Sequence, residues 1–290
     1  MNEERKQQFF SELAPEYAKL TGNTTQDIFG KFLDTYGPKL KITSSSIIHD
    51  NTAGPGTAAQ VLVQRAATTG VKPTIVATDY APSMIETLNR IKAAGAPTDL
   101  AWNNVTAHVC NSDDLSTYSD DYFTHSISNF SLFTITNAVK SLTETRRTLQ
   151  PSGTASILLW KRFAVPALLD AAQDHIKGAG YAAKNAVPVN GPQYFQREAV
   201  PNQLVEAGFE PSRIETWQID HFVTDQGDNK EKWDGLYQFM TSTSIAAAST
   251  KGWSEEESGR WSEAVRSAMD EEHKQFGGLK FEAWVSVARK

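Results

Sequence analysis

The hydrophobic and polar positions of the chain alternate in a way that predicts repeating strand–helix units through its first half. Short apolar runs of the length of buried strands occupy residues 46–49, 74–78, 105–109, 122–128 and 154–160. Segments with the apolar spacing of a helix lie between them, at residues 57–69, 82–94 and 136–149. Strands and helices joined in this order by short connections are typical of a parallel, doubly wound sheet, so we expect an α/β fold.

The pattern changes after residue 160. Helical spacing is found at residues 164–177, 197–207, 231–248 and 254–276, and strand-like alternation at residues 214–222 and 279–288. Ser254 and Glu257 have the spacing of a capping box, which predicts a helix start there. The two late strands fit a terminal β-hairpin that the helices between them interrupt.

Two further helices are expected before the first strand, at residues 3–20 and 24–33. The first has an apolar face that includes Tyr17, which suits either a packed helix or a lid that brings an aromatic ring to the site. We therefore predict three parts: residues 1–40 form an N-terminal helical lid, residues 41–225 and 279–290 the α/β domain, and residues 226–278 a helical cap insertion.

The composition is that of an ordinary globular protein and limits its partners. Hydrophobic residues make up 40% and charged residues 21% of the 290 residues, and the net charge is -6. A negative net charge without a basic run argues against a nucleic-acid partner. Cys110 is the single cysteine, no apolar stretch is long enough to span a membrane, and the first residues are polar. We expect a soluble, cytoplasmic protein that is a monomer or a homodimer.

The segment 47–57, I-I-H-D-N-T-A-G-P-G-T, combines a strand end, a tight turn and a helix start. Gly54 and Gly56 allow a ligand to approach the backbone, and the first N–H groups of the helix offer hydrogen-bond donors. Gly54, Gly56 and Ala59 fit a dinucleotide fingerprint, with Asp79 at the position of the ribose-binding acid. A plain turn with a capping aspartate is a second interpretation.

A third interpretation is the S-adenosylmethionine (SAM) loop, which explains Asp50 best. This acid directly precedes the loop, where it would repel a pyrophosphate but attract an ammonium group. Asp50, Asp79, Asn111 and Asn129 also fall at the ends of four successive predicted strands. Ligands of such sheets bind at the carboxyl ends of the strands, so these residues mark the candidate site.

Residues 47–160 resemble the class I SAM-dependent methyltransferases, and in particular fungal small-molecule methyltransferases of the gliotoxin thiol methyltransferase type. The resemblance implies a Rossmann-like, seven-stranded, mostly parallel sheet that ends in an antiparallel hairpin. It implies that Asp50 holds the SAM amino group and that Gly54 and Gly56 pass the methionine part. Asp79, within A-T-D-Y-A-P-S-M, corresponds to the acid that binds the ribose.

The same resemblance assigns the adenine contacts. Tyr80 and Met84 would flank the ring, and Asn111, Ser112 or Asp113 would bind its edge. Two residues depart from the family pattern: Thr52 replaces a glycine, and Asn111 replaces the usual aspartate. The cofactor-binding residues that we predict are Tyr17, Asp50, Thr52, Gly54, Gly56, Asp79, Tyr80, Met84, Asn111, Ser112, Asp113, Asn129 and Phe130.

Catalytic residues are less clearly marked. His175 and His221 lie in the half expected to form the substrate wall and are the candidates for a general base. Tyr17, Trp160 and Tyr194 are the candidates for substrate contacts. The acidic pairs 113–114 and 120–121 are adjacent in sequence, so their side chains diverge and we expect no metal site.

The predicted function is methyl transfer from SAM to an oxygen, sulfur or nitrogen atom of a small molecule, in secondary metabolism. Two alternatives remain open. One is a SAM-binding protein without methyl transfer, such as a pericyclase or a regulator. The other is a nicotinamide oxidoreductase, although the sequence lacks a Tyr-x-x-x-Lys proton donor after the fourth strand.

Overall fold

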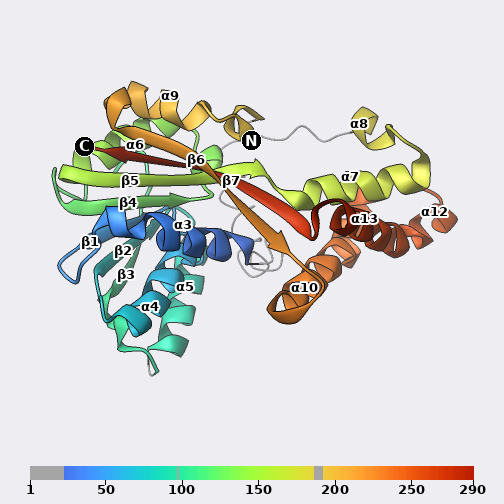
Figure 1. Cartoon of the computed structure of the whole chain (residues 1–290), viewed down its shortest axis with the longest axis horizontal. Helices are drawn as coiled ribbons and strands as arrows, with labels where there is room; N and C mark the ends of the chain where they lie inside the picture. The colour runs from blue at the N-terminus through green and yellow to red at the C-terminus, as the bar shows by residue number, and fades with distance from the viewer. Residues whose placement is uncertain (1–22, 97, 186–191) are drawn as a thin grey trace.

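The computed structural model describes residues 23–96, 98–185 and 192–290, and in them a single seven-stranded sheet. The predicted first helix, with Tyr17, lies outside the described residues. The strand order is β3-β2-β1-β4-β5-β7-β6 (Figure 1). The strands are β1 (Ile47–Asn51), β2 (Thr74–Asp79), β3 (Val105–Val109), β4 (Phe123–Asn129), β5 (Leu149–Arg162), β6 (Ile214–Val223) and β7 (Leu279–Arg289).

The first five strands pair in parallel, and β7 runs antiparallel to both β5 and β6. The predicted parallel sheet with a terminal antiparallel hairpin is therefore confirmed. The carboxyl ends of β1, β2 and β4 meet at one edge. β1 and β4 are neighbours although the chain leaves them in opposite directions, which makes the edge between them the topological switch point.

Helices cover both faces of the sheet (Figure 1). One face carries α3 (Thr24–Leu40), α4 (Thr57–Thr69) and α5 (Pro82–Gly95), and the other carries α6 (Ala138–Thr148) and α9 (Ala199–Glu206). Both faces of the central strands are buried, because helices cover them on each side. Short 3-10 turns complete the described chain at Leu100–Asn104, Leu132–Thr134, Pro192–Phe195, Pro211–Arg213 and Gly227–Asn229.

The helix predicted at residues 24–33 is longer, since α3 continues through Pro38 to Leu40. Proline disfavours a helix interior. Here it falls in the last turn, and the buried ring of Tyr36 stacks on Trp217 of β6 at 4.7 Å between centroids. The tertiary contact thus favours a helical conformation that the local sequence disfavours.

Strand β5 also begins earlier than predicted, at Leu149 instead of residue 154. Leu149 pairs with Phe123, and regular pairing resumes at Thr154 with His125 after a register shift. Pro151 and Ser152, with φ of 67° at Ser152, lie inside this irregularity. A bulge is one of the few places where a sheet accepts proline. Pro151 and Ser152, which lie before the predicted strand, are therefore part of β5.

A helical lobe, made of helices that follow β5 and of helices that join β6 to β7, projects from the sheet (right in Figure 1). It contains α7 (Ala164–Lys177), α8 (Tyr181–Asn185), α10 (Lys230–Met240), α11 (Thr243–Ser249), α12 (Glu255–Gly259) and α13 (Trp261–Phe276). The two long helices predicted after residue 230 are thus four shorter ones. The predicted capping box is confirmed: Ser254 accepts from the Glu257 N–H, and the Glu257 carboxylate accepts from the Ser254 N–H.

The division into three parts stays a prediction, and the packing of two helices bears on it. Ile28, Phe29 and Phe32 of α3, from the segment expected to belong to the lid, are fully buried in the core of the α/β domain. Helix α7, assigned to that domain from the sequence, packs instead along α13 in the helical lobe. Among the described helices none is both long and apolar enough to cross a membrane.

Candidate functional site

Asp79, the last residue of β2, binds the backbone of the loops that follow β1 and β2. Its Oδ2 accepts the Gly54 N–H at 2.8 Å, and its Oδ1 accepts the Ala81 N–H at 2.9 Å. Burial raises the pKa of this carboxyl, against the effect of the two backbone hydrogen bonds. Each carboxylate oxygen keeps a second lone pair, so both can accept a ligand hydroxyl while they hold the loops.

Asp50, at the end of β1, is 1% exposed. Its Oδ2 accepts the Ala59 N–H from the first turn of α4 at 3.0 Å. Burial raises its pKa to about 7, the nearby Asp79 carboxyl adds to the rise, and the Ala59 bond opposes it. A cation placed beside Asp50 would favour the ionised form, so the site is poised to receive positive charge.

The two glycines of the loop serve different purposes. Gly54 has φ of +56°, and a Cβ there would meet nothing within 4 Å, so its backbone faces open space that a ligand can enter. Gly56 has φ of +82°, and a Cβ there would lie 2.3 Å from Leu88 Cδ1 of α5. Glycine is favoured at position 56 by its positive φ, and a side chain there would also have to displace Leu88.

Asn129, at the end of β4, contributes a buried acceptor. Its Nδ2 donates to the Thr25 carbonyl of α3 at 3.5 Å, while its Oδ1 has no hydrogen-bond partner among the described residues. The next residue, Phe130, has φ of 58° and packs its ring 4.1 Å from Trp160 of β5. An orphaned buried acceptor at a strand end is a place for a ligand donor.

These groups fit SAM. Asp50, Asp79 and the free Oδ1 of Asn129 come from three adjacent strand ends and are all acceptors. SAM offers two ribose hydroxyls and an ammonium group as donors. A pyrophosphate would instead meet two carboxyl groups here, which disfavours the dinucleotide interpretation.

The predicted adenine contacts form two groups, one that follows β2 and one that follows the neighbouring strand β3. Met84 is buried with Ala81 at the start of α5, and Tyr80 packs against them. Asn111 is exposed, and its Oδ1 accepts the Asp113 N–H at 3.4 Å, whereas Ser112 is buried. Which of the three binds the ring edge stays a prediction.

The structure separates the two aromatic residues predicted to contact substrate. Trp160 lies on the face that carries α3 and stacks on Phe163, with centroids 5.0 Å apart. Tyr194 lies on the opposite face, where its hydroxyl accepts from Gln203 Nε2 of α9 at 3.0 Å. They cannot line one pocket, because the sheet stands between them. The sequence could not show on which face of the sheet Tyr194 lies, because residue 194 is not part of a strand.

The two candidate histidines are also apart. His175 is on α7 in the helical lobe, where its Nε2 lies 3.1 Å from Glu271 Oε2 of α13. His221 is buried at the carboxyl end of β6, and its Nε2 lies 3.2 Å from Asp27 Oδ2 of α3. It stands directly opposite Phe281, whose ring contacts Trp160. Opposed residues of an antiparallel pair share a face, so His221 is on the same face as Trp160.

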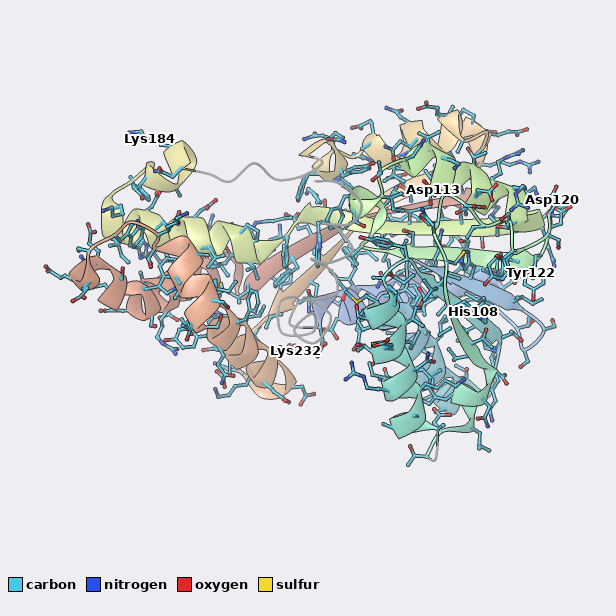
Figure 2. The ribbon with its side chains drawn as sticks, turned by 180° about the vertical axis from the view of Figure 1, so that it is seen from behind. His108, Asp113, Asp120, Tyr122, Lys184 and Lys232 are labelled. Carbon is cyan, nitrogen blue, oxygen red and sulfur yellow. The ribbon has the colours of Figure 1, made fainter. Side chains whose placement is uncertain are left out.

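The acidic pair 120–121 binds cations of the protein itself. The adjacent carboxylates of Asp120 and Asp121 pair with Arg147 and Lys290, each at 2.7 Å. Figure 2 shows Asp113 and Asp120 apart on the segment that joins β3 to β4. In the described ranges no three His, Cys, Asp or Glu side chains are grouped as metal ligands would be.

Three residues near the site went unnoticed in the sequence: Asp27, Ser131 and Asn51. The Asp27 carboxylate accepts a hydrogen bond from Lys232 of α10 and also lies next to His221. Lys232 lies between the α/β domain and the helical lobe (Figure 2). Ser131 contacts Thr52 across the switch point. Asn51 is buried, with its Oδ1 unpartnered among the described residues. Ser131 and Asn51 had a local signal, since each closely follows a predicted strand end.

Comparison with known proteins agrees with this geometry. Residues 50–157 match the model of a methyltransferase domain family. Methyltransferase ucsB of Acremonium sp is 33% identical over 127 residues. That match covers 42% of this chain and 44% of the relative, so the similarity spans less than half of either protein.

Solved structures show the same fold at low sequence identity. The [4+2]-cyclase SpnF has a TM-score of 0.51 at 14% identity, with 90% of this chain and 80% of that one covered. A candidate methyltransferase from Bacillus halodurans has a TM-score of 0.50 at 12% identity, with 89% and 98% covered. Residues 50–157 therefore match a methyltransferase domain family, and the described chain has the fold of these solved structures.

Proposed function

We propose that the protein transfers the methyl group of SAM to an oxygen, sulfur or nitrogen atom of a small molecule of secondary metabolism. One observation carries the proposal. The acceptors of Asp50, Asp79 and Asn129 converge at adjacent strand ends beside the open backbone of Gly54. The fungal methyltransferase relative supports the secondary-metabolite assignment.

The residues of the chain bind and orient the two reactants. Asp79 holds the ribose hydroxyls, and Asp50 with the Asn129 Oδ1 holds the amino end, which fixes the donor along the carboxyl edge of β1 and β4. When bound, SAM supplies an electrophilic methyl group on its sulfonium. The protein then has to align the acceptor with that methyl group and exclude water.

The acceptor lies, in this proposal, on the sheet face of α3, next to Phe130 and Trp160. His221 stands on that face at the end of β6, with its Nε2 3.2 Å from Asp27 Oδ2. It is the better placed of the two histidines to accept a proton from an acceptor hydroxyl or thiol. The cap helices between β6 and β7 would close the outer wall.

Calorimetry with SAM, S-adenosylhomocysteine and NADH tests the cofactor assignment. We expect the first two to bind in the micromolar range and NADH not to bind. Binding of NADH alone would instead favour the nicotinamide oxidoreductase.

A second assay tests the transfer itself. SAM is incubated with the protein and a phenol, a thiol or an amine acceptor, and S-adenosylhomocysteine is quantified by mass spectrometry. Acceptor-dependent release is the expected result. SAM binding without release for any acceptor would favour a non-methylating function, such as that of the cyclase with the same fold.

A further inference from the structure

Two residues at the switch point adopt a backbone conformation that their side chains disfavour. Thr52, after β1, and Phe130, after β4, both have φ of 58°. Positive φ is uncommon outside glycine, and it is a genuine outlier for a β-branched or bulky residue. Thr52 is the only β-branched residue among those found with positive φ in the described chain.

The two strained loops are joined by a chain of hydroxyl groups. Thr52 Oγ1 contacts Ser131 Oγ, which lies 3.0 Å from Ser128 Oγ of β4. Thr52 Oγ1 also donates to the Asn51 carbonyl. We call Thr52, Ser131 and Ser128 the hydroxyl clasp. It bridges the strand ends of β1 and β4, between which ligands of such sheets bind.

The donors of the clasp follow from its first link. Each hydroxyl has one proton to donate. The Thr52 proton goes to the Asn51 carbonyl, so Thr52 Oγ1 accepts from Ser131. Ser131 in turn accepts from Ser128. The clasp is therefore a directed chain from β4 to β1, and loss of the Thr52 or the Ser131 hydroxyl disconnects the two loops.

We propose that the hydroxyl clasp is a positioning device that holds the two strand-end loops at the separation required for SAM binding; the proposal rests on the function proposed above. Glycine at position 52 would adopt the left-handed conformation without strain but could not bridge to Ser131. The strain is explained if the Thr52 hydroxyl is needed there. The clasp then sets the distance between Gly54 in one loop and Asn129 beside the other.

Calorimetry with S-adenosylhomocysteine tests the clasp without knowledge of the acceptor. Thr52→Val keeps the shape of the side chain but removes the hydroxyl, and Ser131→Ala removes its partner. We expect each variant to bind about five- to tenfold more weakly. The double variant should bind no more weakly than the worse single one, because both break the same link. Thr52→Ser, which keeps the hydroxyl, should bind within twofold of the wild type.

Two further variants separate positioning from stability. Thr52→Gly relieves the strain and removes the clasp, so it should lose affinity without a fall in melting temperature. Ser152→Gly relieves a positive φ of 67° at the opposite edge of the sheet and should leave affinity unchanged. Should Thr52→Val fail to fold, Ser131→Ala and Thr52→Gly still give the answer.

The outcomes distinguish this inference from the proposed function. If the wild type binds S-adenosylhomocysteine and the Thr52 and Ser131 variants bind equally well, the clasp has no positioning role, although the function stands. Independent, additive losses in the double variant would also overturn it. If the wild type binds neither S-adenosylhomocysteine nor SAM, the proposed function fails, and the clasp proposal with it.

Discussion

At the scale of single residues, Asp50 is a buried carboxyl whose charge depends on its surroundings. Burial raises its pKa from 3.8 to about 7. The folded protein therefore holds this proton more tightly than the unfolded chain does. The associated stability is fully present below pH 3.8 and is lost as the pH rises through 7.

Asp50→Asn should remove that pH dependence, because the amide is neutral throughout and can still accept the Ala59 N–H. Without ligand, we expect the variant to be more stable than the wild type above pH 7, by on the order of 2–4 kcal/mol. Urea unfolding at pH 6 and pH 8.5 measures this difference. If the free energy of unfolding changes by the same amount between the two pH values in both proteins, Asp50 does not titrate in this range.

Asp79 permits a prediction of ligand affinity. Asp79→Ala should weaken SAM binding by about 2–4 kcal/mol, the scale of a pair of charged hydrogen bonds. Asp99→Ala is the matched control, because the Asp99 carboxylate also accepts a backbone N–H, that of Ala101 at 2.8 Å, but lies away from the site. Calorimetry on both variants should find the loss only for Asp79. Equal affinities would remove Asp79 from the cofactor site.

At the scale of elements, Asp27 joins three of them. It lies on α3 and binds His221 of β6 and Lys232 of α10. Burial alone would raise the pKa of Asp27, but the hydrogen bonds and charges of His221 and Lys232 outweigh burial and lower it below 3.8. Its stabilising contribution is therefore present above pH 3.8 and is lost as the pH falls through the lowered folded value.

Asp27→Asn should accordingly destabilise the protein at pH 7 by about 1–3 kcal/mol, and the difference should narrow below pH 3.8. Asp34→Asn on the same helix is the control. Asp34 pairs with Arg65 at an exposed position, where such pairs contribute little. Chemical unfolding across this pH range compares the two. A deficit of Asp27→Asn that persists at low pH would point to lost packing instead of lost charge.

At the scale of the whole molecule, a largely buried ion pair connects the helical lobe to the sheet. Arg162, the last residue of β5, donates from both terminal nitrogens to Glu272 of α13, each at 2.7 Å. Glu272 also accepts the Lys280 N–H at 2.9 Å, where β7 begins. The side chains are 25% and 9% exposed, so the pair is largely withdrawn from water.

Glu272→Ala should cost about 3–5 kcal/mol, because it leaves the Arg162 charge partly buried without its partner. Glu210→Ala breaks the exposed pair with Arg213 and should cost about 1 kcal/mol or less. Urea unfolding of both variants measures the difference, and hydrogen exchange should show faster opening at the ends of β6 and β7 in Glu272→Ala. Equal costs would mean that apolar packing alone holds the lobe.

The strand–helix order and the candidate loop could be predicted because their signals are local. Apolar runs, turn residues and a capping box are each written within a few positions of the chain, and Asp50 and Asp79 adjoin predicted strand ends. The parallel sheet follows from that order, since only a few topologies join strands through short helical connections. The matched methyltransferase domain covers the part of the chain where these local signals are densest.

The tertiary structure alone decided what depends on residues far apart in sequence. Trp217 packs on Tyr36 and so stabilises the last turn of α3, which contains Pro38. Leu88 of α5 packs against Gly56, and the sheet separates Tyr194 from Trp160. The same holds for the pairing of Asp27 with His221 across 194 positions and for the clasp between Thr52 and Ser131. These contacts are selected by burial and by the satisfaction of polar groups in the folded chain, and neither leaves a periodic trace in the sequence.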